Sequence, residues 1–440
     1  MILSIAVFSL LLIGSFGFFF FQAKKVRRNI LLGKETSRND QKERRLATML
    51  RVAFGQSKMG ARPVAGIMHF FIYVAFLFTQ IELIEIIIDG VSGGHRRIWH
   101  WVHDTFFSVF YTTTINLIEI LSVLAFIATL VFLSRRNIIK LSRFQKPELK
   151  GWPGKDANVI LAMEIVLIVC IMTMNATDLL LQEAGVTLKT SSFVISSQLT
   201  GIFSGLSVSA LEVLERIGWW GHVLGIFGFL VYLPFSKHFH ILLAFPATYY
   251  SNLQAKGKFT NLVSVTDVVM PNFDPGYQSV TDINNPQRFG AKDVQDLTWK
   301  QLLDAYTCTE CGRCTSACPQ NISGKALSPR KILMDTRDRL QEVGKNIDEN
   351  GGQFKDDGKS LLGNYISNEE IWACNTCNAC VQECPVNLDP LSIIMDLRQF
   401  LVLEQSQAPN ELNGMFTNME NNGAPWQFSP SDRLNWAKEQ

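Results

Sequence analysis

The chain has 440 residues, of which 47% are hydrophobic and 18% are charged, and its formal net charge is +2. This balance of charge excludes a nucleic-acid-binding protein that relies on an excess of basic residues, and the apolar content excludes a disordered chain. Nine cysteines are too sparse for a disulfide scaffold, and eight of them fall in two short clusters near the C-terminus. The class that remains is a membrane protein with a small cysteine-rich region.

Long apolar runs dominate the sequence up to about residue 250. A helix that spans a bilayer needs about 20 mostly apolar residues. Five runs meet this requirement: 2–22, 63–89, 105–133, 157–181 and 217–236. The Ser- and Gly-rich run 193–214 is interpreted as an interfacial or re-entrant helix, with a sixth span as the alternative.

The lysines and arginines predict how these spans are oriented. Twelve occur in residues 23–62 and seven in 135–156, whereas residues 90–104 and 182–216 carry two each. The first basic residues follow the first span instead of preceding it, so this span is not a cleaved signal peptide. The positive-inside rule then places the N-terminus outside and the C-terminal region in the cytoplasm, for a multi-pass protein of the bacterial cytoplasmic (inner) membrane.

Two cysteine motifs share the spacing C-x2-C-x2-C-x3-C-P. In such motifs three thiolates hold one [4Fe–4S] cluster, and the fourth cysteine crosses to the other cluster. One predicted ligand set is Cys308, Cys311, Cys314 and Cys384, and the other is Cys374, Cys377, Cys380 and Cys318. Zinc also binds four thiolates, but zinc sites rarely use two runs of four cysteines that each end in proline.

The predicted fold is all-α: a five-span transmembrane helical bundle plus a cytoplasmic α-helical dicluster ferredoxin-like domain. Ser328-Pro329 and Asp389-Pro390 are typical helix starts, the second for a helix over 390–404, whereas the Gly- and Asp-rich stretch 344–363 predicts an exposed loop. The expected domains are a haem b membrane domain (1–250), a linker (251–295), a dicluster domain (296–405) and a partner-docking tail (406–440).

Histidines in the apolar region are candidate haem ligands. His222 lies near the external end of the fifth predicted span, and His240 follows after eighteen residues, which is five turns of a continuous helix. His69, on the cytoplasmic side of the second span, matches His240 in depth, and such a pair on facing helices can bind one b-type haem. A second haem at His222 needs a partner on the external side, where His103 lies nearest the third span. His238 points elsewhere on the helix and is interpreted as a residue without a ligand role, with contact to a quinone headgroup as the alternative.

Carboxylates near the spans bear on proton movement. Glu119 lies midway along the third span, where a carboxylate is costly, so it is the candidate for a proton path. Glu82, Glu85 and Asp89 recur at helical spacing near the end of the second span and are interpreted as an interfacial face.

The sequence from Leu233 to His240, Leu-Pro-Phe-Ser-Lys-His-Phe-His, resembles the haem b subunit of respiratory nitrate reductase. The resemblance implies that His222 and His240 are axial ligands and that His69 lies opposite His240. The family has a second histidine further along the second span, and Thr79 stands there in this chain.

The C-terminal part resembles the dicluster domain of heterodisulfide reductases and related membrane iron–sulfur oxidoreductases. The matching residues are the two cysteine motifs, Gly-Lys-Ala-Leu-Ser-Pro at 324–329 and Met-Glu-Asn-Asn-Gly-Ala-Pro-Trp at 419–426. In fused members of that family a segment like the last precedes cysteine-rich CCG domains, so a separate CCG-domain subunit is the expected partner. The combination of both parts is similar to an electron-transfer-flavoprotein:menaquinone oxidoreductase.

The sequence contains no dinucleotide fingerprint or Walker loop, so the expected chemistry is one-electron transfer through bound cofactors. The expected cofactors are two [4Fe–4S] clusters and one or two b-type haems, with menaquinone as substrate. The expected partners are the CCG subunit, an electron-transfer flavoprotein or similar soluble redox protein, and the quinone pool. The alternatives are a haem-free membrane-anchored ferredoxin-like tether and a redox-sensing membrane protein.

Overall fold

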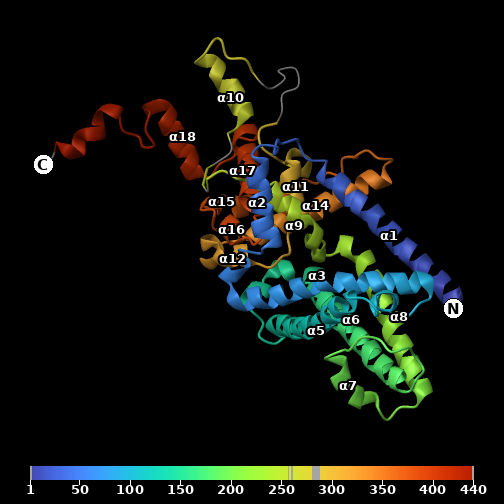
Figure 1. Cartoon of the computed structure of the whole chain (residues 1–440). Helices are drawn as coiled ribbons and strands as arrows, with labels where there is room; N and C mark the ends of the chain where they lie inside the picture. Colours follow the sequence, from blue (N-terminus) through green and yellow to red (C-terminus); the bar gives the residue numbers. More distant parts are fainter. Residues whose placement is uncertain (1, 256, 259–260, 280–287, 439–440) are drawn as a thin grey trace. The chain divides into compact units, whose positions relative to one another are not determined.

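The computed structural model describes residues 2–255, 257–258, 261–279 and 288–438. Within these ranges the chain is helical, and its only β contacts are two isolated bridges. This confirms the predicted all-α fold (Figure 1). The contacts divide the chain into two compact units: residues 1–28, 41–249 and 306–312 form the first, and residues 29–40, 250–305 and 313–440 form the second.

Five helices of the first unit are long and apolar enough to cross a membrane, in agreement with the predicted number. They are α1 (Ile2–Ile30), α3 (Pro63–Ser92), α5 (Phe107–Asn137), α6 (Trp152–Glu183) and α8 (Val208–Tyr232), and α8 is extended by the 3₁₀ turn η5 (Leu233–Phe235). Many large apolar side chains on these helices stay exposed, as expected of surfaces that face lipid.

The helices of this unit pack in pairs: α6 lies along α8, and α3 lies along α5 (Figure 1). Phe8 of α1 is fully buried in a cluster with Ile86, Val223 and Phe227. Gly90 of α3 makes this possible, because a Cβ at position 90 would lie 2.4 Å from the Phe8 ring. A glycine therefore determines how closely α1 approaches α3.

The run 193–214 differs from the predicted single interfacial helix. It divides into α7 (Ser196–Phe203) and the first residues of α8, which begins nine residues before the predicted start of the fifth span. Ser207 caps this earlier start, because its hydroxyl accepts the Ala210 N–H at 3.3 Å. An eight-residue helix such as α7 is about 12 Å long, too short to be a sixth span.

Short elements complete the first unit. They are α2 (Lys42–Met49), η1 (Leu50–Phe54), η2 (Met59–Ala61), α4 (Arg97–Val102), η3 (Ser142–Phe144), η4 (Pro147–Leu149), η6 (Lys237–Phe239) and α9 (His240–Tyr249). Both α2 and the π-helical turn η1 pack against α9. Helix α9, which begins at His240, therefore packs against the chain segment that leads into α3.

The second unit consists of shorter helices. They are α10 (Val263–Val269), η7 (Met270–Asn272), η8 (Val294–Asp296), α11 (Trp299–Thr307, whose last two residues count with the first unit), α12 (Arg313–Ala317), α13 (Pro319–Ile322), α14 (Pro329–Glu349), η9 (Leu361–Tyr365), α15 (Asn368–Trp372), α16 (Ala379–Glu383), α17 (Pro390–Gln399), η10 (Phe400–Glu404), α18 (Asn410–Asn422) and η11 (Pro430–Ala437). The two predicted helix starts are confirmed: Ser328 accepts the Lys331 N–H, and Asp389 accepts the Ser392 N–H.

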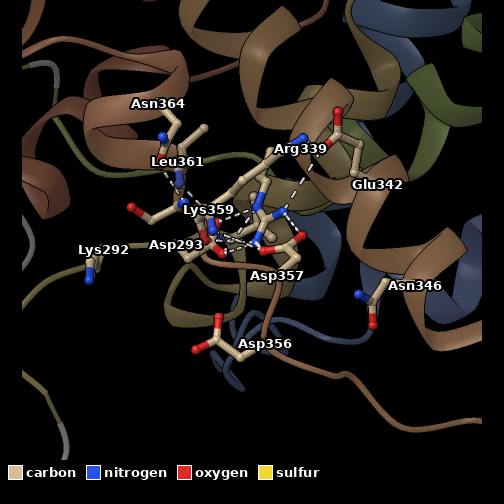
Figure 2. A network of polar contacts seen from close by, with 12 residues as sticks. Lys292, Asp293, Arg339, Glu342, Asn346, Asp356, Asp357, Lys359, Leu361 and Asn364 are labelled. Atoms are coloured by element: carbon tan, nitrogen blue, oxygen red, sulfur yellow. Dashed lines mark hydrogen bonds and ion pairs between the residues drawn. The ribbon is translucent and has the colours of Figure 1, made fainter. Parts of the chain in front are cut away.

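The predicted exposed loop 344–363 is partly wrong. Helix α14 continues to Glu349 because Val343 and Ile347 are buried, and Gly344 packs against the side chain of Asn29. Arg339, whose guanidinium is fully buried, holds the rest of the loop in place through hydrogen bonds (Figure 2).

Arg339 donates to two carboxylates and one carbonyl in Figure 2: Asp293 Oδ2 at 2.7 Å, Asp357 Oδ2 at 2.5 Å and the Lys359 carbonyl at 3.0 Å. Asp293 in turn accepts the Leu361 N–H at 3.0 Å. Loss of this buried guanidinium would leave the Asp293 and Asp357 carboxylates without their positively charged partner, which costs free energy. The two bidentate ion pairs therefore hold both residues in place. The sequence of this loop, rich in Gly and Asp, gave no sign of such anchoring.

Candidate functional site

The two cysteine motifs fold into similar turns. In the first motif the residues on either side of the second cysteine, Glu310 and Gly312, have positive φ angles of 56° and 70°. In the second motif the equivalent residues, Thr376 and Asn378, have φ angles of 56° and 60°. Left-handed backbone at non-glycine residues costs free energy and persists where the surroundings impose it. Both motifs have this backbone at equivalent positions. The repetition indicates that each motif turns its successive thiols toward one centre in the same manner.

A cavity in the second unit is lined by four cysteines. Cys374, Cys377 and Cys380 come from the second motif, and Cys318 is the last cysteine of the first motif. Helices α12 and α16, which follow the turns, pack against each other and bring the two motifs together. The rest of the lining includes the apolar side chains of Leu327, Leu391 and Ile394. The four thiols are the set that the spacing assigns to one cluster.

The thiols in this cavity repel one another as thiolates. Burial raises the pKa of Cys374, and the neighbouring Cys318 and Cys377 raise it further. Burial, Asp389 and Cys374 likewise raise the pKa of Cys380. A cationic iron centre would offset both effects, because metal binding favours the deprotonated thiol. The donor set therefore fits an iron–sulfur cluster.

Backbone groups and one arginine hold the ligand turns in place. The Thr376 N–H donates to Cys374 Sγ at 3.4 Å, and the Leu388 N–H donates to Cys384 Sγ at 3.3 Å. Arg398 of α17 donates to the carbonyls of Ile371 at 2.6 Å and Cys374 at 2.5 Å. N–H···S bonds of this kind orient thiolate ligands and tune reduction potential. Arg398 was not predicted from the sequence, because nothing in the local pattern links it to Cys374.

The other predicted ligand set is divided between the two units. Cys308 and Cys311 belong to the first unit, whereas Cys314 and Cys384 belong to the second. Cys308 is buried, and the other three are partly exposed. The grouping of these four thiols around one cluster stays a prediction.

Three candidate haem ligands share one feature, an oxygen atom at hydrogen-bond distance from Nδ1. The partner is Gln56 Oε1 for His69 at 3.0 Å, the Leu167 carbonyl for His222 at 2.9 Å, and the Lys237 carbonyl for His240 at 3.1 Å. A carbonyl oxygen only accepts, so Nδ1 carries the proton and Nε2 carries the lone pair. Histidines that bind metals through Nε2 are oriented in this way.

His222 and His240 do not lie on one continuous helix, contrary to the prediction. Helix α8 ends at Tyr232, and Ser236 has an extended backbone with φ −107° and ψ 157° between two 3₁₀ turns. Pro234 contributes to the break, because it has no N–H to donate to the carbonyl four residues earlier and its ring crowds that carbonyl. His222 therefore lies midway along α8, and His240 begins a separate helix.

His238 lies closer to the other histidines than predicted. Its ring centroid is 5.4 Å from that of His240, and the two rings meet edge to face. Burial, together with the neighbouring His240 and His69, lowers the pKa of His238, which lies beyond the fifth span, to about 3. The structure therefore brings His69, His238 and His240 into one neighbourhood, where His238 is neutral.

Tyr73 adds a polar group near this neighbourhood. It lies one turn after His69 on α3, and its hydroxyl is buried without a hydrogen-bond partner among the residues that the structure describes. A buried hydroxyl without a partner costs free energy unless a bound group satisfies it. This hydroxyl and the orientation of the imidazoles fit a haem, or another bound group with polar atoms at its edge that could bond to the hydroxyl.

His103 is placed differently from the other candidates. Its Nε2 lies 3.1 Å from Asp104, its Nδ1 bonds the His100 carbonyl at 3.0 Å, and its ring contacts Trp99 and His100. In the described part of the chain these partners all lie on α4 or directly after it. The structure therefore does not bring His103 together with His222.

Glu119 is buried and accepts hydrogen bonds from the start of α7. Its carboxylate receives the N–H groups of Ile195 at 2.8 Å and Ser196 at 3.3 Å, and also the Ser196 hydroxyl. These donors anchor α7 to α5. A proton path through Glu119 stays a prediction, and the contacts show that the carboxylate also has an anchoring role.

The carboxylates near the end of α3 are not an interfacial face. Glu82, Glu85 and Asp89 are only 5%, 1% and 7% exposed, so that interpretation is wrong. Arg96 explains the difference, because its guanidinium donates to Glu82 at 3.1 Å and Glu85 at 3.3 Å, while its own N–H donates to Asp89 at 2.8 Å. One sequence signal could have revealed this cluster. Two adjacent arginines, Arg96 and Arg97, follow three carboxylates that lie on one helix face.

Comparison with known proteins identifies the cysteine-rich region. Residues 307–388 match the family described as 4Fe-4S dicluster domain. Over 93% of its length the chain is 29% identical to a probable iron-sulfur-binding oxidoreductase, FadF, of Bacillus subtilis. Over 96% it is 26% identical to an EtfAB:quinone oxidoreductase of Syntrophomonas wolfei, and over 52% it is 27% identical to a probable membrane-anchored ferredoxin of Chromohalobacter salexigens.

The match covers 57% of each of the first two relatives and 32% of the third. No solved structure matches the chain significantly. The comparisons therefore support an iron–sulfur protein whose dicluster domain shares a chain with five helices that are long and apolar enough to cross a membrane.

Proposed function

We propose that this chain is the membrane electron-transfer subunit of a quinone-linked oxidoreductase. It relays electrons between a cytoplasmic redox partner and menaquinone, in a direction that depends on the reduction potentials of its cofactors. The observation that carries the proposal is the cavity in which three cysteines of one motif meet the last cysteine of the other. Two of the similar proteins are named as oxidoreductases, one of them acting on quinone.

The residues have separate tasks in this proposal. The eight cysteines hold two [4Fe–4S] clusters, and His69 and His240 hold a b-type haem, with His222 as the candidate for a second. These cofactors supply one-electron transfer when they are bound. Gln56, the Leu167 carbonyl and the Lys237 carbonyl orient the imidazoles so that Nε2 is the metal-binding atom.

The proposed partners are soluble proteins. A CCG-type iron–sulfur subunit, an electron-transfer flavoprotein or both exchange electrons with the clusters in the cytoplasm. The C-terminal segment supports such docking, because Phe416, Trp426, Phe428 and Trp436 are exposed there. The distribution of basic residues supports an external N-terminus and a location in the bacterial cytoplasmic membrane.

A spectrum of the protein in membranes tests the haem part of this proposal. Membranes that contain the chain should show a b-type α band in the reduced-minus-oxidised spectrum after addition of a menaquinol analogue. His69→Ala should diminish this band, whereas His103→Ala, which changes a residue whose contacts are with α4 and Asp104, serves as the comparison. A full band in His69→Ala would contradict the ligand assignment.

A second candidate is a haem-free membrane-anchored ferredoxin that tethers a soluble enzyme. The similarity to a protein named as a probable membrane-anchored ferredoxin favours it. The same spectrum separates the two functions, because the tether predicts cluster absorbance without a b-type α band.

A further inference from the structure

Lys237 occupies an enclosed position between α8 and α9. Its side chain is only 10% exposed, and its ammonium donates to Glu310 Oε2 at 2.5 Å and to the Pro153 carbonyl at 2.6 Å. Asp156 lies 3.8 Å from the same ammonium and accepts the Lys237 N–H at 3.2 Å. A lysine this enclosed is uncommon in proteins and is found where opposite charges compensate it.

Glu310, the partner of Lys237, belongs to the first cysteine motif and stands between Cys308 and Cys311. Its side chain is 2% exposed, and its backbone has a φ of 56°. Residues 306–312 belong to the same compact unit as α8 and α9. Neighbouring residues therefore hold the side chain and the backbone conformation of Glu310. Lys237, its ion-pair partner, is one of them.

The other end of Lys237 reaches a candidate haem ligand. Its carbonyl accepts the proton of His240 Nδ1 at 3.1 Å, which sets the tautomer and the ring orientation of that histidine. One residue thus bonds to His240 through its backbone and to the Cys308–Cys311 turn through its side chain.

We propose that Lys237 is the positioning residue that holds the Cys308–Cys311 turn at a fixed place beside the His240 segment. The proposal rests on the proposed function, because Lys237 would fix the distance between the Cys308–Cys311 turn and His240, across which an electron passes. The hydrogen bonds to His240 and to Glu310 use different atoms of Lys237. Replacement of its side chain therefore releases the cysteine turn and leaves the carbonyl bond to His240.

The experiment compares Lys237→Met and Lys237→Arg with the matched control Lys155→Met in the purified full chain. Lys155 lies in the same region at an exposed position. Hydrogen–deuterium exchange first reports the protection of amides 306–312, a readout that does not depend on haem or activity. Lys237→Met should lose protection there, Lys237→Arg should retain most of it, and Lys155→Met should match the wild type.

Stopped-flow reduction of the haem by dithionite then reports the consequence for electron transfer. The rate in Cys311→Ser measures direct reduction and is subtracted. Lys237→Met should lower the remaining rate with unchanged haem content, because the released turn is no longer held at a fixed distance from His240. Lys237→Arg should restore much of the rate.

Unchanged protection of residues 306–312 in Lys237→Met would overturn the proposal, and so would lost protection with an unchanged corrected rate. If Lys237→Met does not fold, Glu310→Gln replaces it, because this variant keeps a side chain of similar size and removes the charge. An absence of haem from the wild type would contradict the proposed function, and the exchange result would still decide whether Lys237 holds the cysteine turn.

Discussion

At the scale of single residues, backbone groups orient the side chains of the candidate sites. Two of the candidate haem ligands bond main-chain carbonyls through Nδ1, and two of the cysteines accept main-chain N–H groups. The residue types and their spacing were readable in the sequence because ligand chemistry restricts them. The groups that orient them, such as the Leu167 carbonyl, depend on how helices pack and leave no local pattern.

The crossed assignment of the cysteines is testable with one substitution. Cys318→Ser should lower cluster iron by about half, because Cys318 completes the set that Cys374, Cys377 and Cys380 begin. Iron and sulfide analysis after anaerobic purification measures the loss. Cys170→Ser, at the cysteine outside the two motifs, should keep the full iron content. A Cys318→Ser protein with both clusters intact would contradict the assignment.

Asp396 should make stability depend on pH. Burial raises its pKa to about 6, and the hydrogen bond from Gln301, 2.6 Å long, offsets this only in part. Because the folded protein holds a proton that the unfolded chain has lost, stability falls as pH rises from about 4 to 6 and is constant above that window. The effect of this shift is at most about 3 kcal/mol.

Asp396→Asn removes this dependence. The unfolding temperature of the variant relative to the wild type should rise by a few degrees between about pH 4 and pH 6 and then stay level. Thermal unfolding in detergent across this range measures the difference, with Asp432→Asn in the exposed C-terminal segment as the control. A difference that is flat from pH 4 to pH 6 would show that Asp396 does not titrate in this way.

At the scale of elements, apolar length and capping residues predicted the helices well. The five spans and the starts of α14 and α17 depend on composition and on local hydrogen bonds, which the sequence displays directly. The break between His222 and His240 was missed although Pro234 stands in it, because eighteen residues fit five helical turns so well. The burial of Glu82, Glu85 and Asp89 was missed because their partner, Arg96, lies outside the helix that carries them.

The contact between α1 and α3 gives a prediction at this scale. Gly90→Val should destabilise the protein by about 1–3 kcal/mol, because its side chain would overlap the buried ring of Phe8. The temperature of thermal aggregation in detergent measures the effect. Gly17→Val, on α1 at a position where a Cβ meets no atom within 4 Å, should be close to neutral. Equal stability of the two variants would contradict the packing described for Phe8.

At the scale of the whole molecule, the chain combines a membrane-spanning unit that carries the candidate haem ligands with a dicluster domain that carries most of the cysteines. The sequence predicted this combination because apolar runs and cysteine spacing are each readable without a structure. It did not predict the contact between Glu310 and Lys237 within the first unit, since both are ordinary charged residues until the fold brings them together.

Quantitative cofactor analysis of the anaerobically purified chain tests the central claim most directly. Iron, sulfide and pyridine haemochromogen are measured on one preparation, and EPR spectroscopy of the reduced sample identifies the clusters. The account predicts two [4Fe–4S] clusters, with about eight cluster irons, together with one or two b-type haems per chain. A preparation with both clusters and no haem would contradict it and would leave the membrane-anchored ferredoxin as the function.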